Sequence, residues 1–238
     1  MIRLATIEAA VIGEPGKVFS TGPEVAIGED GKTCYIKGRN GPTAFSEVAG
    51  CKLAAAMGLR VPAASICSLG DDLYAGVESV PKAQRNIRPW LRDLQRINNS
   101  ADLFSVIAVD TWLANDDRNM GNLVGSSLGD GRIDVFMIDF EKSRTLAENP
   151  FMGSGNVEPR RLWHRDELGG ILRRIRPATT PAAVLDRIRG VSQRQISELI
   201  LPVAAELPFI GWQDSSVEVL FRRAQNIDRL VEAVWETN

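Results

Sequence analysis

The residue types that could do chemistry gather in two short segments near the middle of the chain. Residues 115–122 are rich in Asp and Asn, and Asp139 follows an apolar run at residues 133–138. Residues 123–124 and 133–138 resemble the strands of a hairpin around a Gly-rich turn. Antiparallel pairing of these strands would bring Asn122 beside Asp139. A carboxylate and an amide oxygen held together suit Mg²⁺, which takes oxygen ligands and keeps waters for substrate phosphates.

Asp117 lies five residues before Asn122, on a loop that would face the same point. Its carboxylate could orient a hydroxyl group and accept its proton, while metal and cations stabilise the charge of a transferred phosphoryl group. Asp and Asn are also common in turns and helix caps, so the alternative interpretation is that this segment is only a structural turn. The position of Asp139 directly after an apolar strand favours the chemical interpretation. A Ca²⁺ loop is not favoured, because the D-x-D-x-D-G-x₅-E order is missing.

Protein kinases use the same order of residues, with an H-R-D-x-x-x-x-N loop followed by D-F-G. Lys37 ends an apolar strand ahead of this segment, where it could hold the phosphates of ATP. Glu47 lies ten residues later on the following helix and can pair with Lys37, as a kinase requires to position its nucleotide. A polar turn at residues 20–23 falls where a loop covering the phosphates is expected. The sequence has neither a Walker motif nor G-x-G-x-x-G, so it does not support a Walker-type NTPase or a dinucleotide-binding fold.

The elements that must position these residues change in type along the chain. Residues 25–27 and 33–37 flank an Asp-Gly turn and predict a hairpin, a helix follows over residues 45–57, and residues 61–69 and 73–80 predict two more strands. A helix capped by Ser100 is predicted to end near Asn115. Further helical patterns cover residues 168–175, 182–188, 196–207 and 217–234, the last with Asp214 or Ser215 as its cap. We therefore expect an α+β, bilobal protein-kinase-like fold with a small β-rich N-lobe, residues 1–81, and a helical C-lobe, residues 82–238.

Composition narrows the class of protein further. The chain has 238 residues, 44% hydrophobic and 24% charged, as in an ordinary globular protein. A net charge of −2 gives no electrostatic footprint for nucleic acid or an anionic membrane. No apolar run approaches the ~20 residues of a membrane span. The three cysteines lack zinc-site spacing and predict reduced, mostly buried thiols. We expect a cytoplasmic protein with no membrane partner and no direct nucleic-acid partner.

The chain resembles the HipA-like kinases, the family named for a bacterial toxin–antitoxin kinase, from about residue 18 to residue 146 and more loosely to the end. The best-matching segments are 46–54 (Ser-Glu-Val-Ala-Gly-Cys-Lys-Leu-Ala), 58–62 (Gly-Leu-Arg-Val-Pro), 115–122 (Asn-Asp-Asp-Arg-Asn-Met-Gly-Asn) and 138–140 (Ile-Asp-Phe). The resemblance implies a kinase-like fold with a small β-rich lobe and an all-helical large lobe. It also implies phosphorylation of protein Ser or Thr with ATP and Mg²⁺.

By motif match, the resemblance implies that Asp117 is the catalytic base, that Asn122 and Asp139 bind the metal and that Lys37 holds the ATP phosphates. The residues expected to contact ATP elsewhere are those of the phosphate loop and of the hinge strand that holds adenine through backbone groups: Ser20, Thr21, Gly22, Glu78, Ser79 and Val80. In the family, a Ser of the phosphate loop can be autophosphorylated, and Ser20 or Thr21 could serve here.

Two departures from the family pattern bear on these expectations. Asn119 stands where the family usually has His, which leaves the base intact but could alter packing of the loop. The extra N-terminal subdomain of full-length HipA toxins is missing from the sequence, so an antitoxin partner is left open. Two other functions also stay open. One is a small-molecule phosphotransferase, since aminoglycoside-type kinases share the base–Asn–Asp order, and the other is a nucleotide-binding pseudokinase or docking protein.

Overall fold

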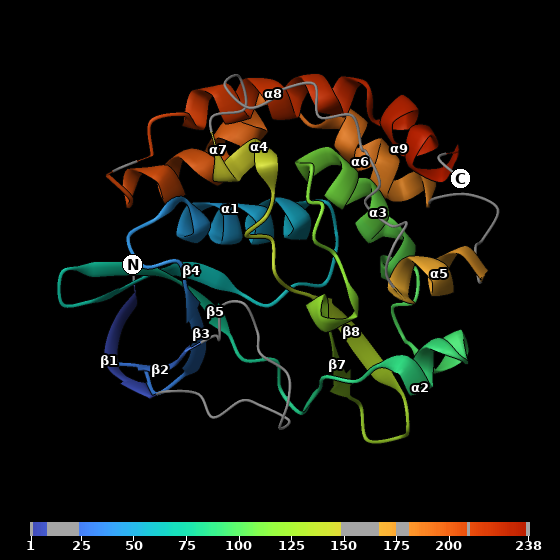
Figure 1. Cartoon of the computed structure of the whole chain (residues 1–238), viewed down its shortest axis with the longest axis horizontal. Helices are drawn as coiled ribbons and strands as arrows, with labels where there is room; N and C mark the ends of the chain where they lie inside the picture. The colour runs from blue at the N-terminus through green and yellow to red at the C-terminus, as the bar shows by residue number, and fades with distance from the viewer. Residues whose placement is uncertain (1, 9–23, 149–166, 175–180, 209, 237–238) are drawn as a thin grey trace.

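The first part of the chain forms a closed five-stranded barrel (Figure 1). The computed structural model describes residues 2–8, 24–148, 167–174, 181–208 and 210–236. The barrel strands follow the order β1-β2-β3-β5-β4. Their bounds are β1 Ile2–Glu8, β2 Glu24–Gly28, β3 Thr33–Lys37, β4 Ala64–Leu69 and β5 Asp72–Glu78. The sequence predicts β2 to β5 but not β1, which closes the barrel by pairing antiparallel with β2 and parallel with β4.

The β2–β3 hairpin forms where its Asp-Gly step predicts it. Gly31 has a φ of +77°, a left-handed conformation that costs glycine little because it has no Cβ. The amide of Gly28 donates to the Lys32 carbonyl at 2.9 Å and closes the turn. Consequently β3 runs back along β2 and ends at Lys37, which sets the position of the lysine side chain.

Helix α1, Pro42–Ala56, lies between the barrel and the layer of C-terminal helices (Figure 1). Proline stands at its first turn, where the missing amide costs nothing. The helix ends at Met57, and Gly58 follows with a φ of +89°. All residues from 44 to 51 are buried, since α1 packs on β4 and β5 on one side and on α4 and α7 on the other. An apolar core therefore runs from β4 and β5 through α1 into the helices, while a smaller cluster of Ala26, Ile36, Cys67 and Tyr74 belongs to the barrel strands alone.

A second, three-stranded sheet of order β6-β7-β8 carries the predicted central hairpin. Its strands are β6 Ala83–Gln84, β7 Leu123–Ser127 and β8 Ile133–Met137. The antiparallel pairing predicted for β7 and β8 is confirmed, with Leu123 opposite Met137. Short helices precede and flank this sheet: α2 Arg88–Leu91, η1 Leu94–Arg96 and η2 Met120–Asn122.

Helix α3, Asp102–Leu113, is predicted correctly, but its predicted cap is wrong. Ala101 is the N-cap residue, and no side chain caps the helix. Residues 98–101 already form a turn that leads into the helix, so the backbone carbonyl of Ser100 accepts the Leu103 amide. At the other end Ala114 adopts a left-handed conformation, φ +52°, which turns the chain toward the loop that carries Asp117.

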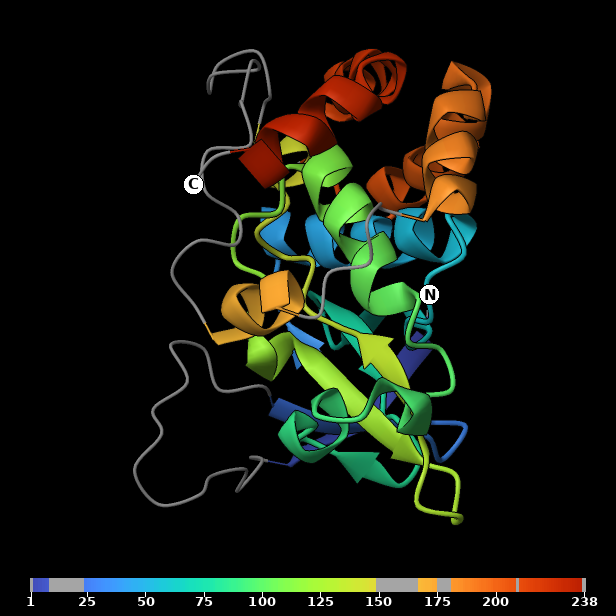
Figure 2. The ribbon, with the colours of Figure 1, turned by 90° about the vertical axis from the view of Figure 1, so that its right-hand side faces the viewer.

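A layer of helices covers α1 and α3, as the views of Figures 1 and 2 show. Its members are α4 Arg144–Ala147, α6 Ala182–Gly190, α7 Gln193–Ala205, α8 Gln213–Gln225 and α9 Ile227–Glu236. Helix α5, Glu167–Arg174, lies apart from this layer, on the side of the second sheet. A capping box of Ser192 and Gln195 starts α7. None of the helices in the described part of the chain is long and apolar enough to cross a membrane. The cytoplasmic location stays a prediction.

The C-terminal apolar pattern belongs to two helices and not to one. Asn226 ends α8, because its side-chain amide donates to the Arg222 carbonyl, and its own carbonyl accepts the Leu230 amide of α9. The predicted caps are also wrong: Trp212, and not Asp214 or Ser215, is the N-cap residue of α8. Apolar periodicity continues across a short break, which explains why sequence reasoning missed it.

Candidate active site

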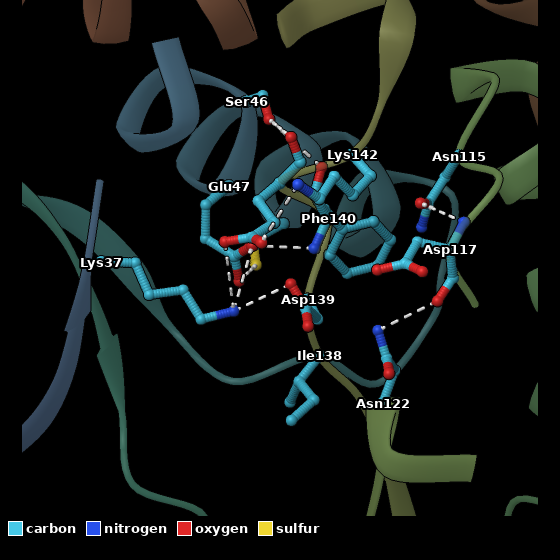
Figure 3. Close-up of polar contacts among 12 residues, drawn as sticks. Lys37, Ser46, Glu47, Asn115, Asp117, Asn122, Ile138, Asp139, Phe140 and Lys142 are labelled. Atoms are coloured by element: carbon cyan, nitrogen blue, oxygen red, sulfur yellow. Dashed lines mark hydrogen bonds and ion pairs between the residues drawn. The ribbon is translucent and has the colours of Figure 1, made fainter. Parts of the chain in front are cut away.

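Lys37 is the centre of a cluster of charged groups that come from distant parts of the chain (Figure 3). Its Nζ lies 2.9 Å from Oδ1 of Asp139, 3.9 Å from Oε2 of Glu47 and 3.8 Å from Oε2 of Glu141. We call these four residues the Lys37 cluster. Burial alone lowers the pKa of Lys37, but the charges of Glu47 and Asp139 outweigh it and raise the pKa. The lysine is therefore a fixed cation at neutral pH.

Glu47 is fully buried on α1 and links this helix to the segment after β8. Its Oε2 accepts the backbone amide of Phe140 at 2.8 Å. Burial raises the pKa of Glu47, and the Lys37 charge acts in the opposite direction. Cys51, one turn later, places its Sγ 4.0 Å from Oε1 of Glu47, and burial raises the pKa of this thiol. A buried, protonated thiol is unreactive, which matches the prediction of buried thiols at all three cysteines.

Asn122 and Asp139 meet at the ends of the paired strands. The amide of Ile138 donates to the Asn122 carbonyl at 3.1 Å, so Asp139 follows directly beside Asn122. Asp139 has a φ of +67°, a left-handed conformation. The side-chain amide of Asn122 donates to the Asp117 carbonyl at 3.4 Å, which leaves its side-chain oxygen as the group available to a cation.

Asp117 lies on the loop of residues 115–122, here called the 115–122 loop, and its side chain faces the strand ends that carry Asn122 and Asp139 (Figure 3). Its backbone amide donates to Oδ1 of Asn115 at 3.4 Å, and its carbonyl accepts the side-chain amide of Asn119 at 2.9 Å. Asp117 is exposed, but desolvation by the surrounding protein groups raises the pKa of its carboxyl, and the negative charge of Asp139 adds to this rise. The carboxylates of Asp117 and Asp139 are therefore close enough to repel each other electrostatically.

Arg118 connects this loop to the segment after β8. It forms a two-pronged ion pair with Asp110 of α3, at 2.8 Å from Nε to Oδ2 and 3.0 Å from Nη2 to Oδ1, and both side chains are completely buried. Its Nη1 donates to the carbonyls of Ile138 and Asn122. The guanidinium also stacks over the ring of Phe140, 4.7 Å from the ring centre. Such buried ion pairs need this full set of partners to offset their desolvation.

The donor set at the strand ends fits Mg²⁺. A carboxylate from Asp139 and an amide oxygen from Asn122 are hard oxygen ligands, and Mg²⁺ takes few protein ligands and completes its shell with water and phosphate. In the described part of the chain, no group of three His, Cys, Asp or Glu side chains could hold a metal by itself.

The remaining predicted ATP contacts have different outcomes. Ser20, Thr21 and Gly22 lie outside the described residues. Glu78 ends β5, and Ser79 and Val80 follow it. The amides of Glu78 and Ser79 already donate to the carbonyls of Ala63 and Thr33, at 2.8 and 3.1 Å. The adenine-binding role of the hinge therefore stays a prediction, and it narrows to backbone groups other than these two amides.

Four residues of the site escaped sequence reasoning: Ser46, Asp110, Arg118 and Glu141. Asp110 carried a usable signal, because it is a charged residue inside the otherwise apolar helix α3 and needs a partner. Arg118 could have supplied that partner from the next polar segment. The sequence gives no comparable indication for Ser46, because serine is common in helices. Only the folded structure shows which groups its hydroxyl binds.

No protein-family model and no curated protein matches the chain. Among solved structures, the crystal structure of the Helicobacter pylori proinflammatory kinase CtkA matches with a TM-score of 0.56 and 13% identity, covering 94% of this chain and 96% of that one. The HipA–HipB toxin–antitoxin complex of Shewanella oneidensis MR-1 with its operator DNA matches with a TM-score of 0.49 and 12% identity, covering 94% of this chain and 64% of that one. The β-rich N-terminal barrel, the helical C-terminal part and the likeness to the CtkA structure confirm the predicted α+β, kinase-like fold.

Proposed function

We propose that this protein is an ATP-dependent phosphotransferase that transfers the γ-phosphoryl group to a Ser or Thr hydroxyl of a protein. The observation that carries the proposal is the Lys37 cluster facing Asp117. Lys37 is paired with Asp139, the buried Glu47 supports both, and the carboxyl of Asp117 lies within electrostatic range of Asp139. These are the cation, the metal-binding carboxylate and the base that phosphoryl transfer requires.

Each residue then has a distinct role. Lys37 binds phosphate oxygens of ATP with its fixed charge, and Glu47 keeps the lysine in place. Asn122 and Asp139 would hold Mg²⁺, which would neutralise negative charge on the phosphates of ATP. Asp117 accepts the proton of the acceptor hydroxyl as its oxygen bonds to the γ-phosphorus and the bond between phosphorus and the leaving ADP oxygen breaks. Asp117 suits this role because its raised pKa makes it a better base than an ordinary aspartate.

The protein acceptor rests on the resemblance of the motifs, whereas the likeness to the CtkA kinase supports phosphoryl transfer without naming an acceptor. The HipA–HipB complex makes an antitoxin a candidate partner, although this chain spans only 64% of that chain. The site residues themselves act on any suitably placed hydroxyl. The choice of acceptor is therefore the part of the proposal that an assay must decide.

The test is transfer of label from γ-labelled ATP with Mg²⁺ to three kinds of acceptor: proteins of a cell lysate, Ser- or Thr-containing peptides, and small alcohols or aminoglycosides. We expect label on protein Ser or Thr, and its loss in Asp117→Ala and Asp139→Ala. Asp130→Ala is the matched control, because Asp130 is exposed and paired with Arg132 away from the site. Label on the small molecules alone would replace the protein acceptor. Equal background turnover in the native protein and both site variants would favour a nucleotide-binding protein without transfer activity.

A further inference from the structure

The metal-binding carboxylate stands on an unusual piece of backbone. Asp139 is left-handed, with a φ of +67°, while its neighbours continue the chain from β8 toward α4. Residues with a Cβ rarely adopt this conformation, although Asp tolerates it better than most. A conformation of this kind persists when surrounding contacts determine it. Side chains from other segments must therefore hold the backbone around Asp139.

Peptide groups on both sides of Asp139 are held by side chains. Before it, the carbonyl of Ile138 accepts Arg118. After it, the amide of Phe140 donates to Glu47, and the carbonyl of Glu141 accepts the hydroxyl of Ser46 at 2.6 Å. Ser46 Oγ also lies 3.3 Å from the Phe140 carbonyl, but its single proton serves mainly the shorter bond. Segment 138–141 is therefore bonded from two directions.

Consecutive residues of α1 supply the second direction. Ser46 and Glu47 bind a carbonyl and an amide of the same short segment, and Gly50 one turn later lets Phe140 pack directly on the helix. A Cβ on Gly50 would lie 2.5 Å from Cβ of Phe140. Because α1 is buried on almost every side, it is a rigid support for this segment.

Ser46 differs from the other groups that hold the segment. Glu47 also pairs with Lys37, and Arg118 also neutralises the buried Asp110. The hydroxyl of Ser46, which is completely buried, has hydrogen bonds to the Phe140 and Glu141 carbonyls as its contacts in the described structure. Its removal therefore perturbs this segment and leaves the charged groups intact.

We infer that Ser46 is a positioning residue that holds segment 138–141 on α1 and thereby fixes the direction of the Asp139 carboxylate for Mg²⁺. The inference rests on the proposed function. Ser46 touches neither metal nor ATP in this role and acts through the backbone. Partners of this kind, one step behind the metal ligands, typically change metal affinity or activity by about 10- to 100-fold when they are lost.

The test compares Ser46→Ala with Ser216→Ala. Ser216 is also completely buried on a helix, α8, and its hydroxyl has no hydrogen-bond partner in the described structure. We expect Ser46→Ala to raise the Mg²⁺ concentration for half-maximal ATP turnover about 10-fold, with recovery of turnover at high Mg²⁺. Ser216→Ala should leave this concentration unchanged. Equal Mg²⁺ dependence in Ser46→Ala and the native protein, or equal shifts in both variants, would overturn the inference.

A second measurement does not depend on turnover. Hydrogen exchange of a peptide covering residues 138–143 reports the Phe140 amide bond to Glu47, and we expect faster exchange in Ser46→Ala but not in Ser216→Ala. If the native protein shows no phosphotransfer, the proposed function fails and this measurement still tests the positioning role. Unchanged exchange in Ser46→Ala would show that the hydroxyl does not hold the segment.

Discussion

The Lys37 cluster and the 115–122 loop form the two sides of one site, but they are built in different ways. Lys37 and Asp139 are 102 residues apart in sequence, and Glu47 and Phe140 are 93 apart. In the loop, side chains of Asn115, Asn119 and Asn122 bond to backbone groups only two to five residues away. One side depends on how three elements pack, and the other is assembled from local turns.

Because of this difference, we expect the Lys37 cluster to be more sensitive than the 115–122 loop to substitutions far away in the sequence. Asn side chains that bond to nearby backbone groups form the same turns wherever the segment lies. The Lys37 cluster keeps its geometry only while α1 stays between the barrel and the helical layer. Arg118 joins the two sides, because it belongs to the loop and bonds to the backbone at Ile138. Substitutions at Arg118 and on α1 therefore test whether the two sides of the site differ in this way.

The largest effect is expected at Arg118. Arg118→Met leaves Asp110 as an unpaired charge in the core, which costs about 3–5 kcal/mol of the free energy of unfolding. Urea unfolding measures this loss. Arg132→Met breaks an exposed pair with Asp130 and should change little. The double variant Arg118→Met with Asp110→Leu should recover much of the stability, since no buried charge remains. A similar loss in the Arg132 variant would contradict this distinction between buried and exposed pairs.

The next effect is expected at Lys37. Lys37→Met removes the cation from a cluster of three carboxylates, and loss of one such charge-stabilising group costs about 10²- to 10³-fold in turnover. Steady-state kinetics with the identified acceptor measures it. Lys52→Met changes an exposed lysine on α1 and serves as the control. Turnover in Lys37→Met equal to that of the control would remove Lys37 from the site.

A smaller effect is expected at Gly50, where helix propensity and packing disagree. In an open helix, Gly→Ala stabilises by about 1 kcal/mol. At Gly50 the new Cβ overlaps Phe140, and overpacking of this kind costs about 1–3 kcal/mol. Gly50→Ala should therefore lower the thermal midpoint of unfolding. Gly190→Ala in α6, where the added Cβ has no heavy atom within 4 Å, should not. An increase for Gly50→Ala would show that the segment moves freely on α1.

The smallest effect is expected from protonation of Asp117. Desolvation by surrounding groups and the Asp139 charge raise the pKa of Asp117 above its unfolded value. Its contribution to stability is therefore present below the unfolded pKa and is lost as pH rises through the folded pKa. At pH 7 the ionised group destabilises the fold, so Asp117→Asn should be slightly more stable than the native protein.

Unfolding by urea at a series of pH values tests this sign. The difference between Asp117→Asn and the native protein should vanish below about pH 4, the ordinary range of an aspartate. Asp71→Asn, in the exposed turn between β4 and β5, is the control for loss of one negative charge. A native protein that is more stable than Asp117→Asn at pH 7 would mean that the carboxylate is held by favourable contacts.

Sequence reasoning succeeded where the determining contacts are local. The Asp-Gly turn at Gly31 predicts the β2–β3 hairpin, and the apolar pattern with Gly58 predicts the end of α1. It failed at three helix starts or ends. Helices α3 and α8 begin without the side-chain caps expected from Ser100 and from Asp214 or Ser215, and the last apolar pattern is divided at Asn226 into two helices. Strand β1 was missed because its role depends on pairing with β2 and β4, which come later in the chain.

The sequence alone was sufficient to recognise a kinase-like order of functional residues: Lys37, then Glu47, then Asp117 and Asn122, then Asp139. It also determined the hairpin that joins the last two, because the spacing of two apolar strands and a Gly-rich turn is a local property. The contacts of Arg118 with the Ile138 carbonyl, before Asp139, and of Ser46 with the Glu141 carbonyl, after it, became visible only in the folded protein. These hydrogen bonds join segments that are far apart in the sequence, so the sequence does not predict that they are close in space. They are brought together because α1 is buried in the core that it shares with the other helices.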